Sequence, residues 1–294
     1  MAIAVPTLPE HQARALEGAY RGAVASKRRQ ALIGAAVLMG CIAAAAWAGD
    51  VDLATFWANL GRFTSYLGRL VYLENGQPVW TDIAEWYWGI GRWTRLLVET
   101  LFIAYIGTVL GGLAALVLCF LAAANLAGRR WVCFLTRRVL EFCRTVPEIV
   151  FALIFVVAFG LGPLPGVLAI AIHTTGALGK LFAEVVENID MKPVDGVAAA
   201  GASWWQTVRF AVVPQVMSNF ASYGLLRFEI NVRGAAVMGF VGAGGIGQDM
   251  LESIRKFYYS DVSAILLLIV LTVTLIDLGT EWLRHHLLGM ERAH

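Results

Sequence analysis

The longest apolar run, residues 94–124, carries only Arg95 and Glu99 as charged side chains. Five further apolar runs cover residues 30–48, 139–160, 167–182, 216–240 and 262–283. A helix needs about 20 such residues to cross a bilayer, and charges in the third and fifth runs lower their hydropathy. Hydrophobic residues make up 59% of the chain and charged residues 15%, against about 45–50% and about 25% in soluble domains. We therefore predict an all-α, polytopic membrane protein with about six transmembrane helices.

Lys and Arg are unevenly distributed over the connecting segments. With a cytoplasmic N-terminus, 13 of the 23 Lys and Arg lie in cytoplasmic segments and five in external segments. Positive side chains are retained on the cytoplasmic side, so we expect both termini in the cytoplasm and an uncleaved first helix. The expected parts are a cytoplasmic arm (1–29), a first transmembrane helix with an external interfacial segment (30–93), a helical core (94–283) containing a cytoplasmic loop (183–215), and a cytoplasmic tail (284–294).

Tryptophan is concentrated in the external segment after the first run. The residues are Trp57, Trp80, Trp86, Trp88 and Trp93. Because an indole ring favours the membrane–water boundary, we expect one or two helices on the outer surface there. A binding site built from these rings is the less favoured alternative. GPLPG at 162–166 predicts a tight external turn, because Gly and Pro interrupt helices.

A polar interruption of the apolar pattern is DGVAAAGASWWQTVRFAVVPQ at 195–215. Gly201 breaks a first helical stretch, and Ser203 is a candidate N-cap for a second. Apolar residues then recur at helical spacing: Trp204, Val208, Ala211 and Val212. Pro214 ends this helix or starts the next, because proline lacks an N–H. The pattern predicts two short helices joined at Gly201, which on this ground alone also fits an ordinary interfacial hairpin.

The spacing of Asp195, Gly201 and Pro214 resembles the cytoplasmic EAA loop of ABC importer permeases. The departures are Asp195 for Glu, Gly196 for the first Ala, Ala211 for Ile and Val213 for Leu. In that family the loop docks onto a separate ATPase subunit. The resemblance therefore implies coupling residues here: Asp195, Gly201, Ala202, Ser203, Trp204 and Pro214.

Three stretches resemble the permease of phosphonate ABC importers more narrowly. They are RTVPEIVFALIFV (144–156), HTTGALGKLFAEVVENID (173–190) and GFVGAGGIGQDM (239–250), the last also similar to methionine importer permeases. The resemblance implies a type I importer permease, working in the bacterial inner membrane as a homodimer. Two ATPase subunits would bind ATP and Mg, and a periplasmic binding protein would deliver phosphonate. Phosphite, phosphate or another small solute are the alternatives within this class.

The sequence lacks the residue patterns that ATP binding, metal binding and covalent catalysis require. TTGALGKLF (174–182) has Thr174 and Leu181 where a P-loop requires Gly and Ser or Thr, so no ATP or other cofactor is expected on this chain. The four cysteines, Cys41, Cys119, Cys133 and Cys143, lack metal-ligand spacing. The sequence shows no nucleophile–base pattern, and its net charge of +2 does not suggest nucleic acid. A membrane enzyme and an ion-coupled transporter are the rivals from other classes.

Charged residues within the predicted spans are the candidates for a translocation path. Arg144 and Glu148, and likewise Glu229 and Arg233, are four residues apart and able to pair on a helix, which leaves Arg227 without a local partner. These pairs are either self-neutralised ties between helices or contacts for an anion. The candidate path comprises Arg144, Glu148, His173, Thr174, Thr175, Arg227, Glu229 and Arg233. For Thr175 and Thr174, hydrogen bonds to their own helix are the simpler use.

GAGGIG is the last candidate element, with Gly242, Gly244, Gly245 and Gly247. A dinucleotide site would need a preceding strand, whereas an apolar helix precedes this segment. The glycines are expected to allow a sharp bend and close helix packing. Anion binding by their free N–H groups is the alternative.

Overall fold

The computed structural model of the protein describes residues 9–126 and 128–291. The first eight residues of the predicted arm and the last three of the predicted tail lie outside this part. Two compact units, Met1–Tyr66 and Leu67–His294, are taken separately. Every regular element in the described residues is a helix, and an isolated bridge joins Tyr72 and Pro78. The predicted all-α class is confirmed.

The first unit contains α1 (Glu10–Ala48) and most of α2 (Leu53–Arg69). The stretch Arg14–Ala48 is long and apolar enough to cross a membrane, in agreement with the span predicted at 30–48. Asp52 begins α2, because its carboxylate accepts hydrogen bonds from the N–H groups of Ala54 (2.8 Å) and Thr55 (3.2 Å). The Thr55 hydroxyl and these N–H groups hold the pKa of Asp52 below its ordinary value.

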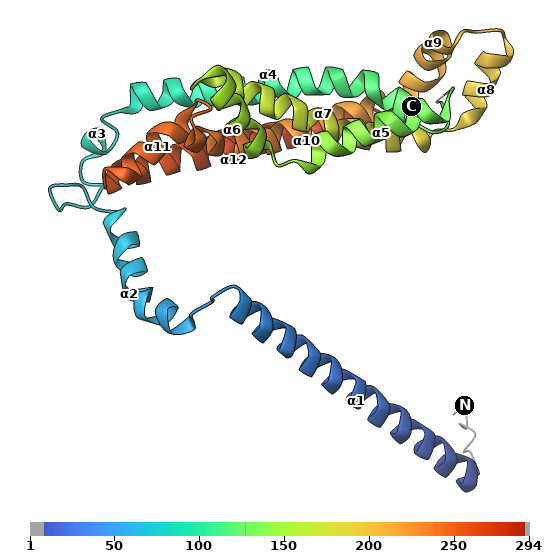
Figure 1. Ribbon diagram of the computed structural model, residues 1–294, viewed down its shortest axis with the longest axis horizontal. Coiled ribbons are helices and arrows are strands. Elements are labelled where there is room, and N and C mark those ends of the chain that lie inside the picture. Colours follow the sequence, from blue (N-terminus) through green and yellow to red (C-terminus); the bar gives the residue numbers. More distant parts are fainter. Residues whose placement is uncertain (1–8, 127, 292–294) are drawn as a thin grey trace, which may run out of the picture. The chain divides into compact units, whose positions relative to one another are not determined.

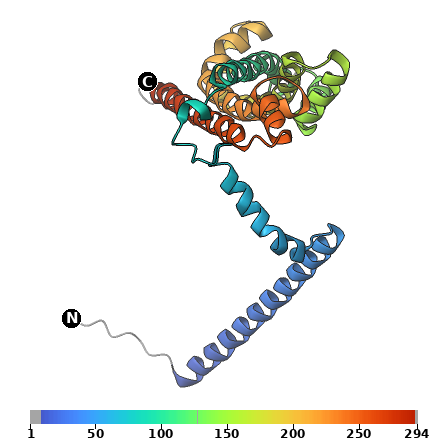
Figure 2. The same cartoon turned by 90° about the vertical axis from the view of Figure 1, so that its left-hand side faces the viewer.

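The second unit is a bundle of long helices, shown in Figure 1. Its elements are α3 (Ile83–Trp86), α4 (Ile90–Ala122), α5 (Arg130–Thr145), α6 (Glu148–Phe159), α7 (Pro163–Glu187), α8 (Met191–Ala199), α9 (Trp204–Thr207), the π-helix η1 (Val208–Val212), α10 (Val213–Met238), the 3₁₀-helix η2 (Gly239–Val241), α11 (Ile246–Arg255) and α12 (Tyr259–Glu291). Helices α4, α7, α10 and α12 run along one another, with α8 and α9 at one end and α3 and α11 at the other. In the end-on view of Figure 2, α12 lies on one side of this bundle and the α5–α6 segment on the opposite side.

Small residues set the closest helix contacts. A Cβ at Gly107 of α4 would lie 2.6 Å from the Ile170 Cγ2, and one at Gly111 would lie 2.6 Å from the Ala171 carbonyl oxygen of α7. A Cβ at Gly176 of α7 would likewise lie 2.6 Å from the Leu140 carbonyl oxygen of α5. Between helices in lipid, association depends on van der Waals packing and interhelical hydrogen bonds, and small residues favour both by letting the backbones approach closely.

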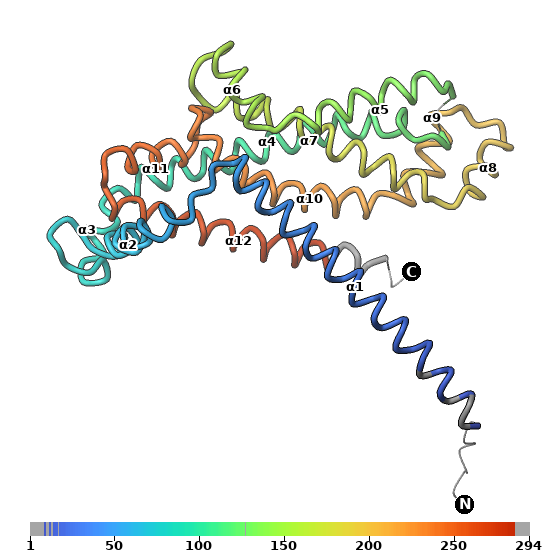
Figure 3. Tube along the Cα trace, turned by 60° about the horizontal axis from the view of Figure 1, so that its bottom comes forward, coloured from blue at the N-terminus to red at the C-terminus, as the bar shows by residue number. Residues whose placement is uncertain are grey.

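Within residues 9–126 and 128–291, four helices are long and apolar enough to span a membrane, or five when the bent α5–α6 pair is counted as one span. The continuous span predicted at 139–160 is wrong, because the chain bends by 84° between α5 and α6. Pro147 causes the break: it has no N–H, and it holds Val146 in an extended conformation (ψ 122°). Figure 3 shows α6 leaving the direction of α5. The predicted span 216–240 corresponds to α10, whose Arg227, Glu229 and Arg233 lower its hydropathy.

The turn predicted at 162–166 lies slightly earlier in the chain. Gly160 (φ 87°) and Gly162 (φ 141°) take the backbone conformations that reverse its direction. Pro163 is the first residue of α7, and Pro165 and Gly166 lie inside that helix. Prolines are tolerated in a first turn, because the N–H groups there have no helical acceptor.

Candidate coupling loop and translocation site

Residues 190–207, comprising α8, a turn and α9, form the candidate coupling loop. Asp190 begins α8 by accepting a hydrogen bond from the Lys192 N–H at 3.0 Å. Gly201 follows α8 with a φ of 85°, a left-handed conformation that a residue with a Cβ adopts at a cost. Two helical segments meet at Gly201 as predicted, but only α8 is a separate short helix, because α9 continues through η1 into α10. Residues 183–187 belong to α7 and not to the loop.

Helix α9 begins after Ser203, as predicted. The Ser203 N–H donates to the Gln206 Oε1 at 2.7 Å, and the Ser203 hydroxyl donates to the same oxygen at 2.9 Å. The Trp204 Nε1–H reaches across the loop to the Leu126 carbonyl oxygen at 3.0 Å. Trp205, in contrast, is 69% exposed. The side chain of Trp204 is therefore attached to the bundle, whereas that of Trp205 is open to the surroundings.

Pro214 lies in the first turn of α10, in agreement with the alternative that it starts a helix, but no break precedes that helix. The chain continues from α9 through η1 into α10, where Pro214 is the second residue. The Val213 N–H donates to the Val208 carbonyl oxygen, the i to i−5 bond of a π-helix. The wider turn accommodates a proline that has no N–H to donate, so the loop is joined to α10 by continuous helix.

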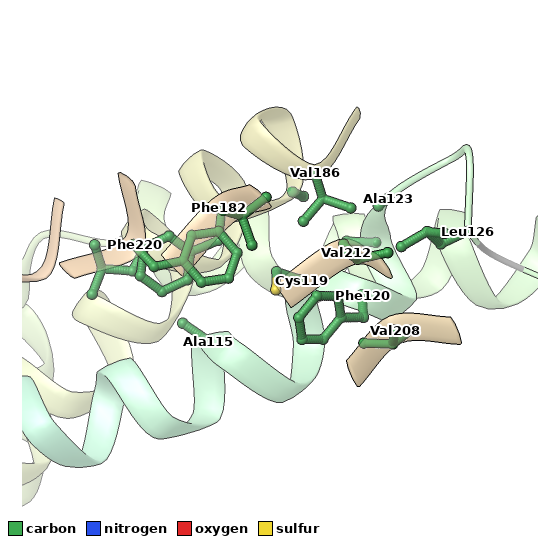
Figure 4. Close-up of a cluster of buried hydrophobic side chains, with 14 of the residues drawn as sticks. Ala115, Cys119, Phe120, Ala123, Leu126, Phe182, Val186, Val208, Val212 and Phe220 are labelled. Atoms are coloured by element: carbon green, nitrogen blue, oxygen red, sulfur yellow. The ribbon is translucent and has the colours of Figure 1, made fainter. Parts of the chain in front are cut away.

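A buried apolar cluster packs between η1 and the helices α4, α7 and α10, and it includes Val194 of the loop (Figure 4). Val208 and Val212 of η1 pack in it with Phe120 of α4. Phe182 of α7 stacks on Phe220 of α10 with their ring centroids 4.1 Å apart. The predicted apolar positions Val208, Ala211 and Val212 are all buried. The cluster therefore packs η1 against α4, α7 and α10.

Gln215 makes a second attachment that the sequence did not suggest. Its Oε1 accepts from the Asp190 N–H at 3.1 Å, and its Nε2 donates to the Asp190 carbonyl oxygen at 3.2 Å. This reciprocal pair ties the start of α8 to the start of α10. No local pattern connects two residues this far apart in sequence.

Polar side chains of four helices meet between α4, α6, α7 and α10. We call this group the polar site: Thr108, Glu148, His173, Thr174, Arg227 and Asn231. The Arg227 guanidinium hydrogen-bonds to the His173 Nδ1, and its Nε lies 3.5 Å from the Thr174 hydroxyl oxygen. An arginine can only donate, so the Nδ1 of His173 accepts and its ring is neutral. The Arg227 side chain is 12% exposed.

Asn231 connects two threonines of the polar site. It is fully buried, and its Nδ2 donates to the hydroxyl oxygens of Thr108 at 2.8 Å and Thr174 at 2.9 Å. Its Oδ1 accepts no hydrogen bond from the described residues. Sequence reasoning missed Asn231 and Thr108. An amide four residues after Arg227, on the same face of α10, was the available signal.

The predicted pairing of Arg144 with Glu148 is wrong for the described residues. The helix is broken between them, so their spacing no longer places them on one face, and Glu148 faces Arg227 at 3.7 Å and the His173 Nδ1 at 3.5 Å. The predicted pairing of Glu229 with Arg233 is confirmed. Asp277 of α12 adds a second carboxylate to Arg233 at 3.1 Å.

Thr175 lies outside the polar site. Its hydroxyl donates to the Ala171 carbonyl oxygen at 2.8 Å, within its own helix, whereas Thr174 faces Asn231. The two threonines therefore have different surroundings although they are adjacent in sequence.

The glycine segment forms a bend, with positive φ at Gly242, Gly244 and Gly245. A Cβ at Gly239 would lie 2.7 Å from the Gly247 Cα, so helix packing is close. The Gly245 N–H donates to Glu99 at 3.2 Å, and the next N–H, of Ile246, donates to the Thr100 hydroxyl oxygen at 2.9 Å. The N–H groups of Gly245 and Ile246 are thus already bonded to side chains of α4, and of the candidate glycines Gly245 has no free N–H for the alternative of anion binding.

In the described part of the chain, no group of three His, Cys, Asp or Glu side chains is placed to hold a metal ion. Cys119 and Cys133 are buried, Cys143 is partly buried and Cys41 is exposed. The polar site thus presents one guanidinium, one imidazole, one carboxylate and hydroxyl and amide groups, a set suited to binding an oxyanion without a metal.

Comparison with known proteins gives the same family over most of the chain. Residues 107–288 match the model of the binding-protein-dependent transport system inner membrane component. The phosphite transport system permease protein PtxC of Stutzerimonas stutzeri is 40% identical over 240 residues, covering 81% of this chain and 86% of that protein. PhnE2 of Escherichia coli K12, named as a permease of a cryptic phosphonate transport system, is 49% identical over 119 residues, covering 40% of this chain and 98% of that protein.

A solved structure shows the same fold. The MetNI methionine ABC transporter in an inward-facing conformation aligns with a TM-score of 0.57 and 18% identity, covering 66% of this chain and 95% of the matched chain. The family works with a separate ATPase and a substrate-binding protein, and its members transport and do not catalyse. The chain belongs to the binding-protein-dependent transport system inner membrane component family, the multi-pass permease subunits of ABC importers.

Proposed function

We propose that this permease imports small phosphorus oxyanions, with phosphonates as the substrates and phosphite as the main alternative. Two of its relatives are named for phosphite and phosphonate transport. Both ligands are small tetrahedral anions, so the same donors fit either. The proposal is carried by the surroundings of Arg227, a cation only 12% exposed that faces a neutral histidine and one carboxylate at 3.7 Å.

Arg227, and not Arg233, is the proposed anion contact. Arg233 is 48% exposed and is held by two carboxylates, those of Glu229 and Asp277. Arg227 has one carboxylate at 3.7 Å, which leaves its planar group able to receive another anion. His173 and Thr174 would complete the contact, and Arg144, Thr175 and the glycines 242–247 would line the route more peripherally.

The assembly we propose is a homodimer in the bacterial inner membrane with both termini cytoplasmic. Each copy binds one ATPase subunit through the candidate coupling loop, in which Asp195 and Trp205 are exposed and Ala202 is partly exposed. ATP and Mg are bound by the ATPases, and a periplasmic protein delivers the anion. A movement of the loop would pass through η1 into α10, because these segments form one continuous helix. Since α10 carries Arg227, the nucleotide bound by the ATPase would thereby affect the geometry of the polar site.

The test is ATP hydrolysis by the reconstituted permease–ATPase complex. Its binding protein is added empty or loaded with methylphosphonate, phosphite, phosphate or methionine. We expect methylphosphonate or phosphite to stimulate hydrolysis above the empty protein. Stimulation by methionine alone would overturn the substrate class, and stimulation by phosphate alone would move the preference to the smaller inorganic anion.

A further inference from the structure

Glu148 is an unusually loose partner for a buried arginine. Its Oε2 lies 3.7 Å from the Arg227 guanidinium and 3.5 Å from the His173 Nδ1. That oxygen is buried and accepts no hydrogen bond from the described residues. Charge-assisted hydrogen bonds normally close to about 2.7–2.9 Å, as Arg92 and Asp249 do at 2.7 Å. The carboxylate is therefore near enough to neutralise Arg227 and too far to hold it.

A recess on α10 seats the other carboxylate oxygen. Gly234 stands opposite the Glu148 Oε1, so closely that any Cβ at position 234 would collide with it. Residues 227, 231 and 234 share one face of α10, because their spacings are four and three. The carboxylate thus rests on bare backbone beside Arg227 and above Asn231, at a place that only glycine leaves free.

We propose that Glu148 is a displaceable counter-ion for Arg227. When the site is empty, the carboxylate neutralises a cation that would be costly to leave alone at membrane depth. When a phosphorus oxyanion arrives, it replaces the carboxylate on Arg227 and lies beside the Thr174 hydroxyl, which the Arg227 Nε approaches to 3.5 Å. Departure of the anion returns Glu148 to its seat on Gly234. This inference rests on the proposed function, since it takes Arg227 to be the anion contact.

Arg233, also on α10, gives the geometry of a closely held arginine for comparison. Arg233 contacts Glu229 directly and Asp277 at 3.1 Å, so both of its carboxylates are engaged at hydrogen-bond distance. If Glu148 served only to fix Arg227, the same close geometry would be expected. The loose pair at Glu148 instead allows exchange, because little energy is lost when one anion replaces another there.

The test is equilibrium binding of radiolabelled phosphite to the purified permease–ATPase complex in nanodiscs without the binding protein. Glu148→Gln removes the internal competitor and should tighten phosphite binding at least about tenfold, because like charges no longer compete for one cation. Glu148→Gln combined with Arg227→Gln should abolish this gain. Glu184→Gln is the matched control, since Glu184 lies 3.7 Å from Lys180 in an equally long pair, and it should change nothing.

Gly234→Ala supplies a second variant that keeps every charge. Its Cβ would collide with the Glu148 Oε1 and force the carboxylate out of its seat beside Arg227, so phosphite should again bind more tightly, by a smaller factor. Gly224→Ala on the same helix is its control, since a Cβ there meets nothing within 4 Å. If Glu148→Gln does not assemble, Gly234→Ala decides the question.

Unchanged or weaker phosphite binding in both variants would overturn the inference. The ATPase assay separates this from failure of the proposed function. Stimulation of the wild-type complex by phosphite-loaded or phosphonate-loaded binding protein, without tighter binding in either variant, rejects only the counter-ion. Absence of stimulation by every phosphorus oxyanion rejects the proposed function and the counter-ion with it.

Discussion

The candidate coupling loop and the polar site differ in how closely their polar groups are held. In the loop, the capping hydrogen bonds and the contacts of Trp204 and Gln215 all lie at 2.7–3.2 Å, over a buried apolar cluster. In the polar site, Glu148 lies at 3.7 Å from Arg227, and one oxygen each of Glu148 and Asn231 accepts nothing from the described residues. A part that transmits force needs one fixed geometry, whereas a part that takes and releases an anion needs contacts that can be exchanged.

The largest expected effect is that of Arg227→Gln on phosphite uptake. Removing a buried cation that contacts the anion costs about 2–5 kcal/mol, so uptake by cells lacking other importers should fall about 100-fold or more. ATPase co-purification should remain normal, because the loop is untouched.

Arg233→Gln is the control for that comparison. It removes a tie between α10 and α12, so the unfolding temperature of the complex should fall by about 2–4 °C, while uptake stays within about threefold of wild type. Equal loss of uptake in both arginine variants would show that the two sites do not differ.

Gly111→Ala tests how closely the polar site depends on the α4–α7 contact. Its Cβ would lie 2.6 Å from the Ala171 carbonyl oxygen and 2.7 Å from the Thr174 Cβ. Overpacking of this kind costs about 1–3 kcal/mol, so thermal unfolding of the complex should begin at a lower temperature. Gly112→Ala is the matched control, because its nearest neighbour lies at 3.8 Å. Equal unfolding temperatures in the two variants would contradict the packing argument.

Gly201→Ala tests the fixed geometry of the loop. A Cβ at this position meets nothing within 4 Å, so glycine is favoured here by the left-handed backbone conformation and not by a lack of space. The left-handed backbone then costs about 1–2 kcal/mol, and co-purification of the ATPase should weaken about tenfold. Gly196→Ala, inside α8 and equally free of contacts, should leave the ATPase bound. A normal yield of ATPase with Gly201→Ala would show that the left-handed conformation at this position is not required for docking.

The smallest effect is expected for Trp204→Phe. It removes the hydrogen bond to the Leu126 carbonyl oxygen, which is worth about 1 kcal/mol. The melting temperature should fall slightly and phosphite binding should not change. Trp131→Phe serves for comparison, since Trp131 is 62% exposed. A larger loss in the Trp131 variant would argue against the anchoring role of Trp204.

The same contrast explains what the sequence revealed. The loop was predictable because its signals are local: Gly201 needs a left-handed backbone, Ser203 begins a helix, and Val208 and Val212 repeat at helical spacing. The polar site was only partly predictable. Arg227 was recognised as unpaired within its own helix, but its partners come from α6 and α7, and no spacing along one helix shows them.

Two errors have the same origin. Glu148 was paired with Arg144 because a continuous helix was assumed across Pro147, and the bend there turned the side chain toward α10. Asn231 was missed because its partners Thr108 and Thr174 are distant in sequence. Contacts between helices depend on how the bundle packs, and that information is spread over many small residues such as Gly107 and Gly111.

The most direct test of the account measures two quantities on one set of complexes: the amount of ATPase subunit bound, and the stimulation of ATP hydrolysis by phosphite-loaded or phosphonate-loaded binding protein. Wild type, Arg227→Gln and Gly201→Ala are compared. The account predicts that Arg227→Gln keeps the ATPase and loses the response to the ligand. It predicts that Gly201→Ala releases the ATPase, while phosphite binding to the permease persists. If both variants lose both properties together, the division between a coupling loop and an anion site is wrong.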